Sequence, residues 1–350
     1  MENAINVSAH YLMPQRVHNM VSDFTWMIGG PQGSGVETAA NIFSQVFSKM
    51  GYQIFGKREY YSNIKGEHSY FAVRISDKKI RSSVKGTNML IAFDAETIFR
   101  HVDDVLENGI IIYDSTLENM KISDVITFEN DFKDRLENIL KSKNKESNVK
   151  GMLELASENG VTIHSVSFRS LLTELSEKLE NPRIKNMSRM FNVLGVSLSL
   201  GLLMIPSEKL TESINSIFSK KKSIADMNVS AANFAYNYAA AKFDEPNFKF
   251  KAKEIEENTL LVQGYYGTSL GKIIAGCRFQ SYYPITPATD ESNFLETNEI
   301  LEINEDRPGS TLVIQTEDEI SAIGMAIGSS LTGVRSATCT PGPGFVLMAE

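Results

Sequence analysis

The apolar positions of residues 24–242 alternate between short continuous runs and amphipathic stretches. Residues 24–28 form a short, mostly apolar run, which predicts a buried strand. Residues 37–50 place apolar side chains on one helical face, which predicts a helix. The same rhythm predicts further strands and one more helix, at 70–75, 89–93, 110–113 and 161–164 for the strands and 95–105 for the helix. Strands that alternate with helices are typical of a parallel sheet covered by helices.

Other stretches of this region depart from that rhythm. Residues 1–23 are mixed and polar, and they predict an N-terminal arm. Residues 134–148 are rich in Lys, Asn and Glu, so we expect a solvated excursion there. Helices are expected to dominate from about 170 to 241, and the apolar stretch 193–205 predicts a buried helix.

A second α/β unit follows a charged segment. Residues 243–257 pack charges around Pro246 with little apolar content, which predicts a linker. Residues 258–350 then carry a shorter alternation, with strands expected at 259–262, 279–283, 311–315 and 336–340 and helices at 267–275, 291–301 and 317–331. The fold class expected is α/β, with two domains, 24–242 and 258–350, that both have mainly parallel sheets. Residues 344–350 read as the start of a helix without a C-terminal signal, so we expect a chain truncated within the second domain.

Composition narrows the function classes. With 350 residues, of which 42% are hydrophobic and 22% charged, the chain is an ordinary globular protein long enough for two cores. A net charge of -8 argues against a nucleic-acid surface. The two cysteines, Cys277 and Cys339, exclude a disulfide scaffold and a four-cysteine cluster held by this chain alone, and they favour the reducing cytoplasm. We expect no membrane partner, because no apolar run is long enough to span a bilayer.

The most informative motif is the stretch 283–287, which reads YPITP. Each proline fixes its own φ and pushes the preceding residue towards extended geometry, so Tyr283 and Thr286 should lie in a stiff loop. A stiff loop can hold the Thr286 hydroxyl as a fixed hydrogen-bond donor, which is what positioning a small carboxylate requires. The alternative is a rigid connection in which Thr289 or Asp290 is the N-cap of the next helix.

A glycine turn separates the first predicted strand from the first predicted helix, and it contains Gly29, Gly30, Gly33 and Gly35. Such a turn lets backbone amides approach a phosphate at a helix N-terminus. The spacing is neither the dinucleotide fingerprint nor a Walker motif, so a turn required only for packing is an equal alternative. In the GEHSYF stretch 66–71, His68 is expected to be an ordinary polar residue rather than a metal ligand.

Several motifs, in order along the chain, resemble the 2-oxoacid:ferredoxin oxidoreductase family. The glycine turn and the GEHSYF stretch resemble the gamma subunit of these enzymes. The YPITP loop, the QTEDE segment 315–319 and the GPGF segment 342–345 resemble the beginning of their alpha subunit. The chain is therefore similar to a fusion of gamma and alpha, in which residues 258–350 correspond to the incomplete pyrimidine-type domain of a thiamine-diphosphate enzyme.

The resemblance implies a reaction and its cofactors. Enzymes of this family convert a 2-oxoacid, such as pyruvate or 2-oxoglutarate, to acyl-coenzyme A and carbon dioxide, and they reduce ferredoxin. Thiamine diphosphate with its Mg²⁺ and the [4Fe-4S] cluster are held mainly by a separate beta subunit. The resemblance therefore implies that this chain holds no metal itself and is active only with a beta subunit.

The resemblance also implies ligand-binding residues. Tyr283, Thr286 and Pro287 are expected to bind the 2-oxoacid, and the four glycines of the glycine turn are expected to bind coenzyme A. Pro341 replaces a serine that is usual in the family before the GPGF segment, which removes a hydroxyl there. The arginine that grips the substrate carboxylate in the family lies past residue 350, so we expect an incomplete substrate site.

One catalytic residue is implied as well. Counting back from Gly324, Glu319 matches the glutamate that bonds the aminopyrimidine of thiamine diphosphate, and Glu317 is the runner-up. The preference for acidic residues at a helix N-terminus accounts for at least two of the three residues Glu317, Asp318 and Glu319. We expect Glu319 to be buried on the packed side of its helix, together with Ile320, Ile323 and Ile327.

Two other function classes compete with this one. A truncated chain could be a binding module for coenzyme A or for the beta subunit without turnover, which the DNA downstream of codon 350 would distinguish. A dehydrogenase with a dinucleotide at the glycine turn is the third class, and nicotinamide-cofactor binding would test it.

Overall fold

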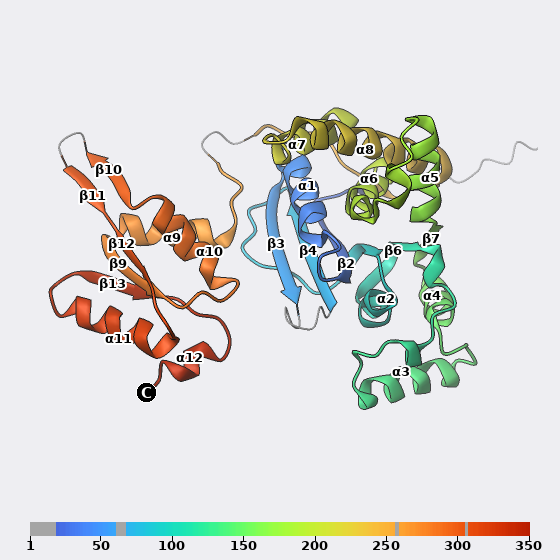
Figure 1. Ribbon diagram of the computed structural model, residues 1–350. Coiled ribbons are helices and arrows are strands. Elements are labelled where there is room, and N and C mark those ends of the chain that lie inside the picture. Colours follow the sequence, from blue (N-terminus) through green and yellow to red (C-terminus); the bar gives the residue numbers. More distant parts are fainter. Residues whose placement is uncertain (1–18, 61–67, 256–258, 305–306) are drawn as a thin grey trace, which may run out of the picture. The chain divides into compact units, whose positions relative to one another are not determined.

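The structure is a computed structural model that describes residues 19–60, 68–255, 259–304 and 307–350. The chain divides into two compact units, unit 1 (Met1–Asn258) and unit 2 (Thr259–Glu350), which are drawn in Figure 1. Both units combine β-sheets with helices, so the chain has an α/β fold. None of the described helices is both long and apolar enough to cross a membrane.

Unit 1 is built on a six-stranded sheet in the order β3-β4-β2-β5-β6-β7. Four of its strands form the parallel part, with bounds β2 Asp23–Pro31, β5 Thr87–Ala92, β6 Val105–Asp114 and β7 Thr162–Val166. The other two strands are antiparallel additions at the β2 side, with bounds β4 His68–Ser76 and β3 Gln53–Tyr60. Strand β3 was not predicted, and it pairs along its whole length with β4. The sheet is therefore mixed but mainly parallel.

Two layers of helices cover the two faces of this sheet (Figure 1). One layer consists of α1 Val36–Ser48, α5 Phe168–Lys178, α6 Phe191–Leu202, α7 Ser207–Ile217 and α8 Lys222–Lys242. The other contains α2 Ala95–His101, α3 Asn130–Ser142 and α4 Val149–Glu158. The pleat of β2 shows the division, because Trp26 lies in the first core and Met27 in the second. Trp26 stacks on Phe43 of α1 at 4.4 Å between ring centroids, and its ring nitrogen donates to Ser199 of α6 at 2.9 Å.

Two predicted segments of unit 1 differ from the structure. The solvated excursion at 134–148 is wrong in part, because α3 occupies Asn130–Ser142 and buries Leu136 and Leu140. The helix predicted at 95–105 ends earlier, and a single 3-10 turn, Val102–Asp104, leads directly into β6. Three-residue 3-10 turns also lie at Ser115–Leu117, Ile122–Asp124, Ile184–Asn186 and Ser188–Met190.

The segment predicted as a linker is attached to unit 1 over much of its length. Strand β8 (Phe248–Lys249) pairs in parallel with β1 (Asn19–Met20). The rings of Phe248 and Phe250 lie 5.1 and 5.3 Å from that of Phe24. The Lys253 amide donates to the Met50 carbonyl at 2.9 Å. Two aromatic residues in a charged segment were enough to bind it to the core of unit 1.

Unit 2 has a three-stranded parallel sheet in the order β12-β9-β13. Its strands are β9 Cys277–Tyr282, β12 Leu312–Gln315 and β13 Arg335–Thr338. Helices α9 Gly264–Ile274 and α10 Ala288–Thr297 lie on one face, and α11 Glu319–Ser330 lies on the other (Figure 1). Side chains of β9 show this alternation, since Gln280 contacts α9 and α10 while the Ser281 hydroxyl donates to the Ala322 carbonyl of α11.

Unit 2 corrects two further expectations. Residues 259–262 form no strand, and Leu260 is 82% exposed. An antiparallel hairpin of β10 (Ile300–Asn304) and β11 (Arg307–Ser310) follows α10 and was not predicted. The chain continues after β13 into a short helix, α12 (Gly344–Leu347).

Candidate functional site

The candidate site lies where the three strands of the unit-2 sheet end. Because β9, β12 and β13 are parallel, their carboxyl ends meet at one edge of the sheet. The segments that leave this carboxyl edge are 283–287 after β9, 316–319 after β12 and 339–344 after β13. Open α/β sheets bind ligands at this kind of edge, and here it collects the YPITP loop, the acidic segment and the GPGF turn.

The YPITP loop runs from the end of β9 to the start of α10. Tyr283 is half-buried, while Thr286 and Pro287 are exposed, and the Thr286–Pro287 peptide bond is cis. Pro287 is the N-cap residue of α10, so neither Thr289 nor Asp290 has the capping role that the alternative interpretation gave them. The Thr289 amide donates to the Ile285 carbonyl at 3.1 Å, which closes the loop onto the helix. The Thr286 side chain thus lies exposed at the carboxyl edge.

The three acidic residues after β12 have three different environments. Glu317 is exposed. Asp318 is the N-cap of α11 and accepts from the Ser321 amide at 2.7 Å, a hydrogen bond that lowers the pKa of its carboxyl. Glu319 is the first residue of α11 and is only 6% exposed. Glu319 is therefore the one buried carboxylate of the three.

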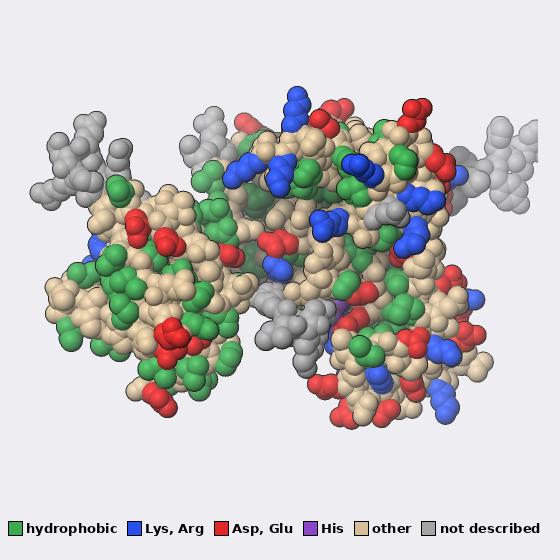
Figure 2. Space-filling model, in the orientation of Figure 1, with side chains coloured by type: hydrophobic (Ala, Val, Ile, Leu, Met, Phe, Trp, Pro, Cys, Tyr) green, Lys and Arg blue, Asp and Glu red, His purple; other side chains and the backbone are tan. Residues whose placement is uncertain are grey.

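The packed side of α11 differs from the one that the sequence predicted. Glu319 shares the packed side of α11 with Ala322 and Ala326. Ile320 and Ile327 are 44% and 56% exposed, so the expectation that they pack inward within this chain is wrong, whereas Ile323 is half-buried. The small alanines let α11 approach the sheet, which turns the larger apolar side chains outward. The apolar face of α11 continues at α12, where Phe345 and Val346 are exposed, and Figure 2 shows hydrophobic side chains spread over this unit.

A contact that the sequence did not predict joins Glu319 to the GPGF turn. Gly344 is buried at the start of α12, and a Cβ atom on it would lie 2.6 Å from Glu319 Oε1. The same Cβ atom would also collide with the Thr340 hydroxyl. Only glycine therefore lets the turn approach the carboxylate this closely. The second glycine of the GPGF segment was the available signal, but its contact with Glu319 could not be read from the sequence.

The four glycines of the glycine turn in unit 1 are required for two different reasons, close packing and positive φ. A Cβ atom on Gly29 would lie 2.6 Å from Thr97, so Gly29 allows α2 to pack on β2, and Gly30 is similarly close to Phe93. Gly33 and Gly35 have φ values of 85° and 83°, which L side chains rarely adopt.

The turn also presents polar groups at the start of α1. Gly35 is the N-cap residue of α1, and no side chain caps this end. The Ser34 hydroxyl is buried and has no hydrogen-bond partner among the described residues. Asn192 of α6 supports the turn from behind, as its side-chain amide donates to the Gly35 carbonyl at 3.4 Å. Uncapped helix amides and an unpartnered hydroxyl are suited to an anion such as phosphate.

His68 is not the ordinary polar residue that the sequence predicted. It is 1% exposed, and its Nε2 atom lies 3.0 Å from Nε2 of His101. His101 Nδ1 lies 3.1 Å from an Asp104 carboxylate oxygen. Burial, followed by the nearby His101 and Arg100 charges, lowers the pKa of His68 to about 3. No group of three or more metal-ligating side chains occurs among the residues that the structure describes, and Gly66 and Glu67 of the same motif lie outside them.

Family models match both units. Residues 25–238 match the model described as pyruvate ferredoxin/flavodoxin oxidoreductase. Residues 270–350 match the model described as the thiamine-diphosphate-binding region of pyruvate flavodoxin/ferredoxin oxidoreductase. The two matched regions contain the glycine turn and the carboxyl edge, respectively.

Known proteins give the same picture. The chain is 41% identical over 331 residues to the alpha subunit of 2-oxoacid:ferredoxin oxidoreductase 1 from Sulfurisphaera tokodaii, covering 93% of this chain and 51% of that protein. It is 39% identical over 332 residues to the corresponding alpha subunit from Saccharolobus solfataricus, with the same coverage. The chain thus spans about half the length of the curated relatives that it matches.

A solved structure shares the fold. The 2-oxoglutarate:ferredoxin oxidoreductase from Magnetococcus marinus, solved with 2-oxoglutarate, coenzyme A and succinyl-CoA, superimposes with a TM-score of 0.67 and 21% identity. The match covers 94% of this chain and 49% of that chain. With both units matched by family models and nearly all of the chain aligned to alpha subunits, the protein belongs to the pyruvate ferredoxin/flavodoxin oxidoreductase family.

Proposed function

We propose that the chain is a gamma–alpha subunit portion of a 2-oxoacid:ferredoxin oxidoreductase. In this function it contributes to the oxidative decarboxylation of a 2-oxoacid to acyl-coenzyme A and carbon dioxide, with reduction of ferredoxin. The observation that carries the proposal is the buried Glu319 at the carboxyl edge of a unit that matches the thiamine-diphosphate-binding family model. Among the three acidic residues of its segment, Glu319 alone combines burial with a position against the GPGF turn.

The residues at the carboxyl edge fit the pyrimidine end of thiamine diphosphate. When bound, this cofactor supplies a carbon nucleophile that attacks the 2-oxo group and accepts electrons from the breaking carbon–carbon bond. Glu319 would hold a proton opposite the ring nitrogen of the aminopyrimidine, a task for which a buried carboxyl is suited. Gly344 lets the GPGF turn lie against the carboxyl, because a Cβ atom there would lie 2.6 Å from Glu319 Oε1. The family match over 270–350 supports this assignment.

The YPITP loop is proposed to bind the 2-oxoacid. Thr286 would donate its hydroxyl to the substrate carboxylate, a charge-assisted hydrogen bond that is stronger than a neutral one. Tyr283 and Pro287 would shape the loop around the substrate, since they lie on either side of Thr286. Thr286 is exposed at the same edge as the buried Glu319, so one ligand could contact both.

The glycine turn of unit 1 is proposed to take part in coenzyme A binding. The Ser34 hydroxyl and the uncapped amides at the start of α1 would meet a phosphate oxygen of coenzyme A. Gly33 would allow close approach, because no atom lies within 4 Å of the position that a Cβ atom would occupy there. Gly29 and Gly30 would act indirectly, through the packing of the turn.

The remaining cofactors are proposed to lie on a beta subunit. A [4Fe-4S] cluster needs four cysteine thiolates, and the chain contains two cysteines. The cluster would therefore come from that partner, and the family resemblance implies the same for Mg²⁺ with the diphosphate and for the ferredoxin contact. A binding module for coenzyme A or for the beta subunit without turnover is the second candidate, favoured by the uncapped start of α1 and the unpartnered Ser34 hydroxyl among the described residues of unit 1.

Reconstitution with a beta subunit tests the proposal. The chain is mixed with a beta subunit of the family, and ferredoxin reduction is measured with pyruvate, 2-oxoglutarate or a branched-chain 2-oxoacid, with and without coenzyme A. Reduction that requires both the 2-oxoacid and coenzyme A would support the enzyme. Binding of coenzyme A and of the beta subunit without any reduction would instead support the binding module.

A further inference from the structure

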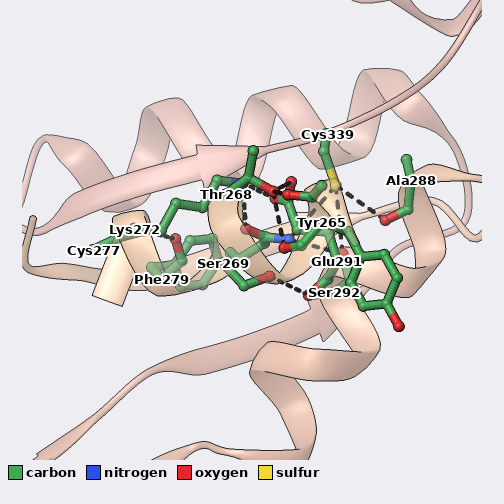
Figure 3. Close-up of polar contacts among 12 residues, drawn as sticks. Tyr265, Thr268, Ser269, Lys272, Cys277, Phe279, Ala288, Glu291, Ser292 and Cys339 are labelled. Atoms are coloured by element: carbon green, nitrogen blue, oxygen red, sulfur yellow. Dashed lines mark hydrogen bonds and ion pairs between the residues drawn. The ribbon is translucent and has the colours of Figure 1, made fainter. Parts of the chain in front are cut away.

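A polar network with a buried centre links α9, β9 and the segment after β13 to the first turns of α10, the helix that follows the YPITP loop (Figure 3). It begins with an ion pair between Lys272 of α9 and Glu291 of α10. Thr268 of α9 donates to the second oxygen of Glu291 at 2.8 Å. The network ends at Cys339, which directly follows β13 at the carboxyl edge. Gln280 and Ser292, which connect these ends, are both fully buried.

The orientation of the Gln280 amide is fixed by its neighbours. The Lys272 ammonium can only donate hydrogen bonds, and it donates to Gln280 Oε1 at 2.8 Å. The Gln280 amide nitrogen therefore points to the other side, where it donates to Ser292 Oγ at 2.8 Å and to Cys339 Sγ at 3.6 Å. Cys339 in turn donates to the Ala288 carbonyl at 3.6 Å. Burial raises the pKa of the Cys339 thiol, so the thiol keeps the proton that this last bond needs.

The network meets α10 at its first turn. Ala288 is the residue after Pro287, and Ser292 lies one turn further along the same helix. Both contacts fix the start of α10, which directly continues the loop that carries Thr286. Cys339 also immediately precedes Thr340, which lies against Gly344 beside Glu319. The thiol therefore joins the loop after β9 to the turn after β13.

We infer that Cys339 is a positioning residue: together with Gln280 and Ser292 it fixes the first turn of α10 and so holds the Thr286 loop in place for the 2-oxoacid. The role of the loop in binding the 2-oxoacid rests on the proposed function. The role of Cys339 in fixing the first turn of α10 rests on the hydrogen bonds alone. A loop that is anchored by a buried chain of hydrogen bonds has fewer conformations before the substrate binds. Less conformational entropy is then lost when the substrate binds.

The two cysteines provide a matched experiment on the assembled enzyme. Cys277 starts β9 at the far end of the strand and is also buried, and its thiol donates to the Phe279 carbonyl at 3.3 Å. Cys339→Ala, Cys339→Ser and Cys277→Ala are compared by backbone amide exchange over residues 285–292 and by separate KM values for the 2-oxoacid and coenzyme A. Gln280→Met removes the central amide and provides a second variant of the same network.

The expected result separates position from catalysis. Cys339→Ala should speed amide exchange at 285–292 and raise the 2-oxoacid KM about two- to tenfold, as expected for the loss of one net hydrogen bond, with kcat and the coenzyme A KM little changed. Cys339→Ser should keep amide exchange and the 2-oxoacid KM close to the wild-type values, because a hydroxyl can still donate to the Ala288 carbonyl. Equal exchange in Cys339→Ala and Cys277→Ala, or no rescue by serine, would overturn the inference. Faster exchange at 285–292 with an unchanged 2-oxoacid KM would support the positioning of the loop and count against its proposed role in substrate binding.

Discussion

At the scale of single residues, three adjacent carboxylates have three separate tasks. Glu317 is solvated, Asp318 caps α11, and Glu319 is buried beside Gly344. The preference for acidic residues at a helix N-terminus explains why they occur here, but it does not distinguish the roles of the three residues. Burial and the neighbouring glycine turn distinguish Glu319 from the other two, and we propose the catalytic role for Glu319 on this ground.

We predict that Glu319→Gln preserves fold and assembly but slows proton exchange at C2 of bound thiamine diphosphate by about 10²–10⁴-fold, as is usual when an acid–base group is lost. The amide is nearly isosteric but cannot share a proton with the pyrimidine nitrogen. Glu317→Gln is the matched control and should be mild, because it removes a first-turn charge worth about 0.3–1 kcal/mol of helix stability. C2 hydrogen–deuterium exchange in both complexes measures this. Loss of exchange in Glu317→Gln alone would move the role to that residue.

Thr286→Ala is predicted to lower kcat/KM for the 2-oxoacid by about 10- to 100-fold, which corresponds to one charge-assisted hydrogen bond of about 1.5–3 kcal/mol. Folding should be unaffected because the side chain is exposed. Steady-state kinetics of the assembled enzyme, with the denaturation midpoint as the folding control, checks both points. An unchanged kcat/KM would show that Thr286 is only a loop residue.

At the residue scale, the sequence predicted motifs, but it did not predict the contacts between residues that are distant in the sequence. The YPITP loop was singled out because two prolines bracket one hydroxyl, and Glu319 was assigned by its position before Gly324 in a helix that resembles the family's. The links between Glu319 and Gly344, and between Ser292 and Cys339, join residues 25 and 47 positions apart, respectively, and depend on the parallel strand order. His68 was misjudged for the same reason, since its partner His101 lies 33 positions away.

At the scale of elements, substitutions at two glycines of the glycine turn distinguish the cost of backbone strain from the cost of a steric clash. Gly33→Ala and Gly35→Ala both place a Cβ atom at positive φ, which costs about 1–2 kcal/mol. Gly35→Ala also drives that atom into Asn192, whereas nothing lies near Gly33. We predict that Gly35→Ala lowers the free energy of unfolding by about 1–3 kcal/mol more than Gly33→Ala does, the usual cost of overpacking. Urea denaturation of both variants would show equal losses if Asn192 can move aside.

The contact between β4 and α2 predicts a pH dependence of stability. The pKa of His68 is about 3 in the folded protein and 6.5 in a model peptide, so the unfolded chain binds a proton more readily between these values. Stability should therefore fall as pH falls below about 6.5, by about 2 kcal/mol between pH 7 and pH 5 from this residue. His68→Gln should flatten the slope of the unfolding free energy over this range. A slope that is identical in the wild type and the variant would contradict a neutral, buried His68.

The element-scale predictions succeeded where apolar periodicity and a partner strand coincide. Strands β2, β4, β5, β6 and β12 follow from short apolar runs within an α/β rhythm. Strand β3 was missed because its second half is charged and it is stabilised by pairing with β4. The apolar run at 259–262 failed for the opposite reason, as no strand pairs with it. Helix α3 was missed because few apolar side chains, Leu136, Leu140 and the partly buried Phe132, dock a largely charged segment.

At the scale of the whole molecule, we predict that the purified chain without a partner reduces no ferredoxin in the presence of a 2-oxoacid and coenzyme A. Two cysteines cannot supply the four thiolates of a [4Fe-4S] cluster. Spectroscopic assays of the chain, alone and after addition of a beta subunit, measure this. Thiamine- and ferredoxin-dependent turnover by the chain alone would refute the proposed division of labour.

The outward-facing side chains of α11 and α12 have a consequence for how the protein is made. Ile320, Ile327, Phe345 and Val346 are exposed on adjoining helices of unit 2. Apolar surface of this kind tends to associate with whatever protein surface is at hand. During synthesis the newly folded chain would therefore be a substrate for chaperones and proteases until these side chains are covered. Its abundance in the cell should then follow the supply of the covering surface rather than the rate of its own translation.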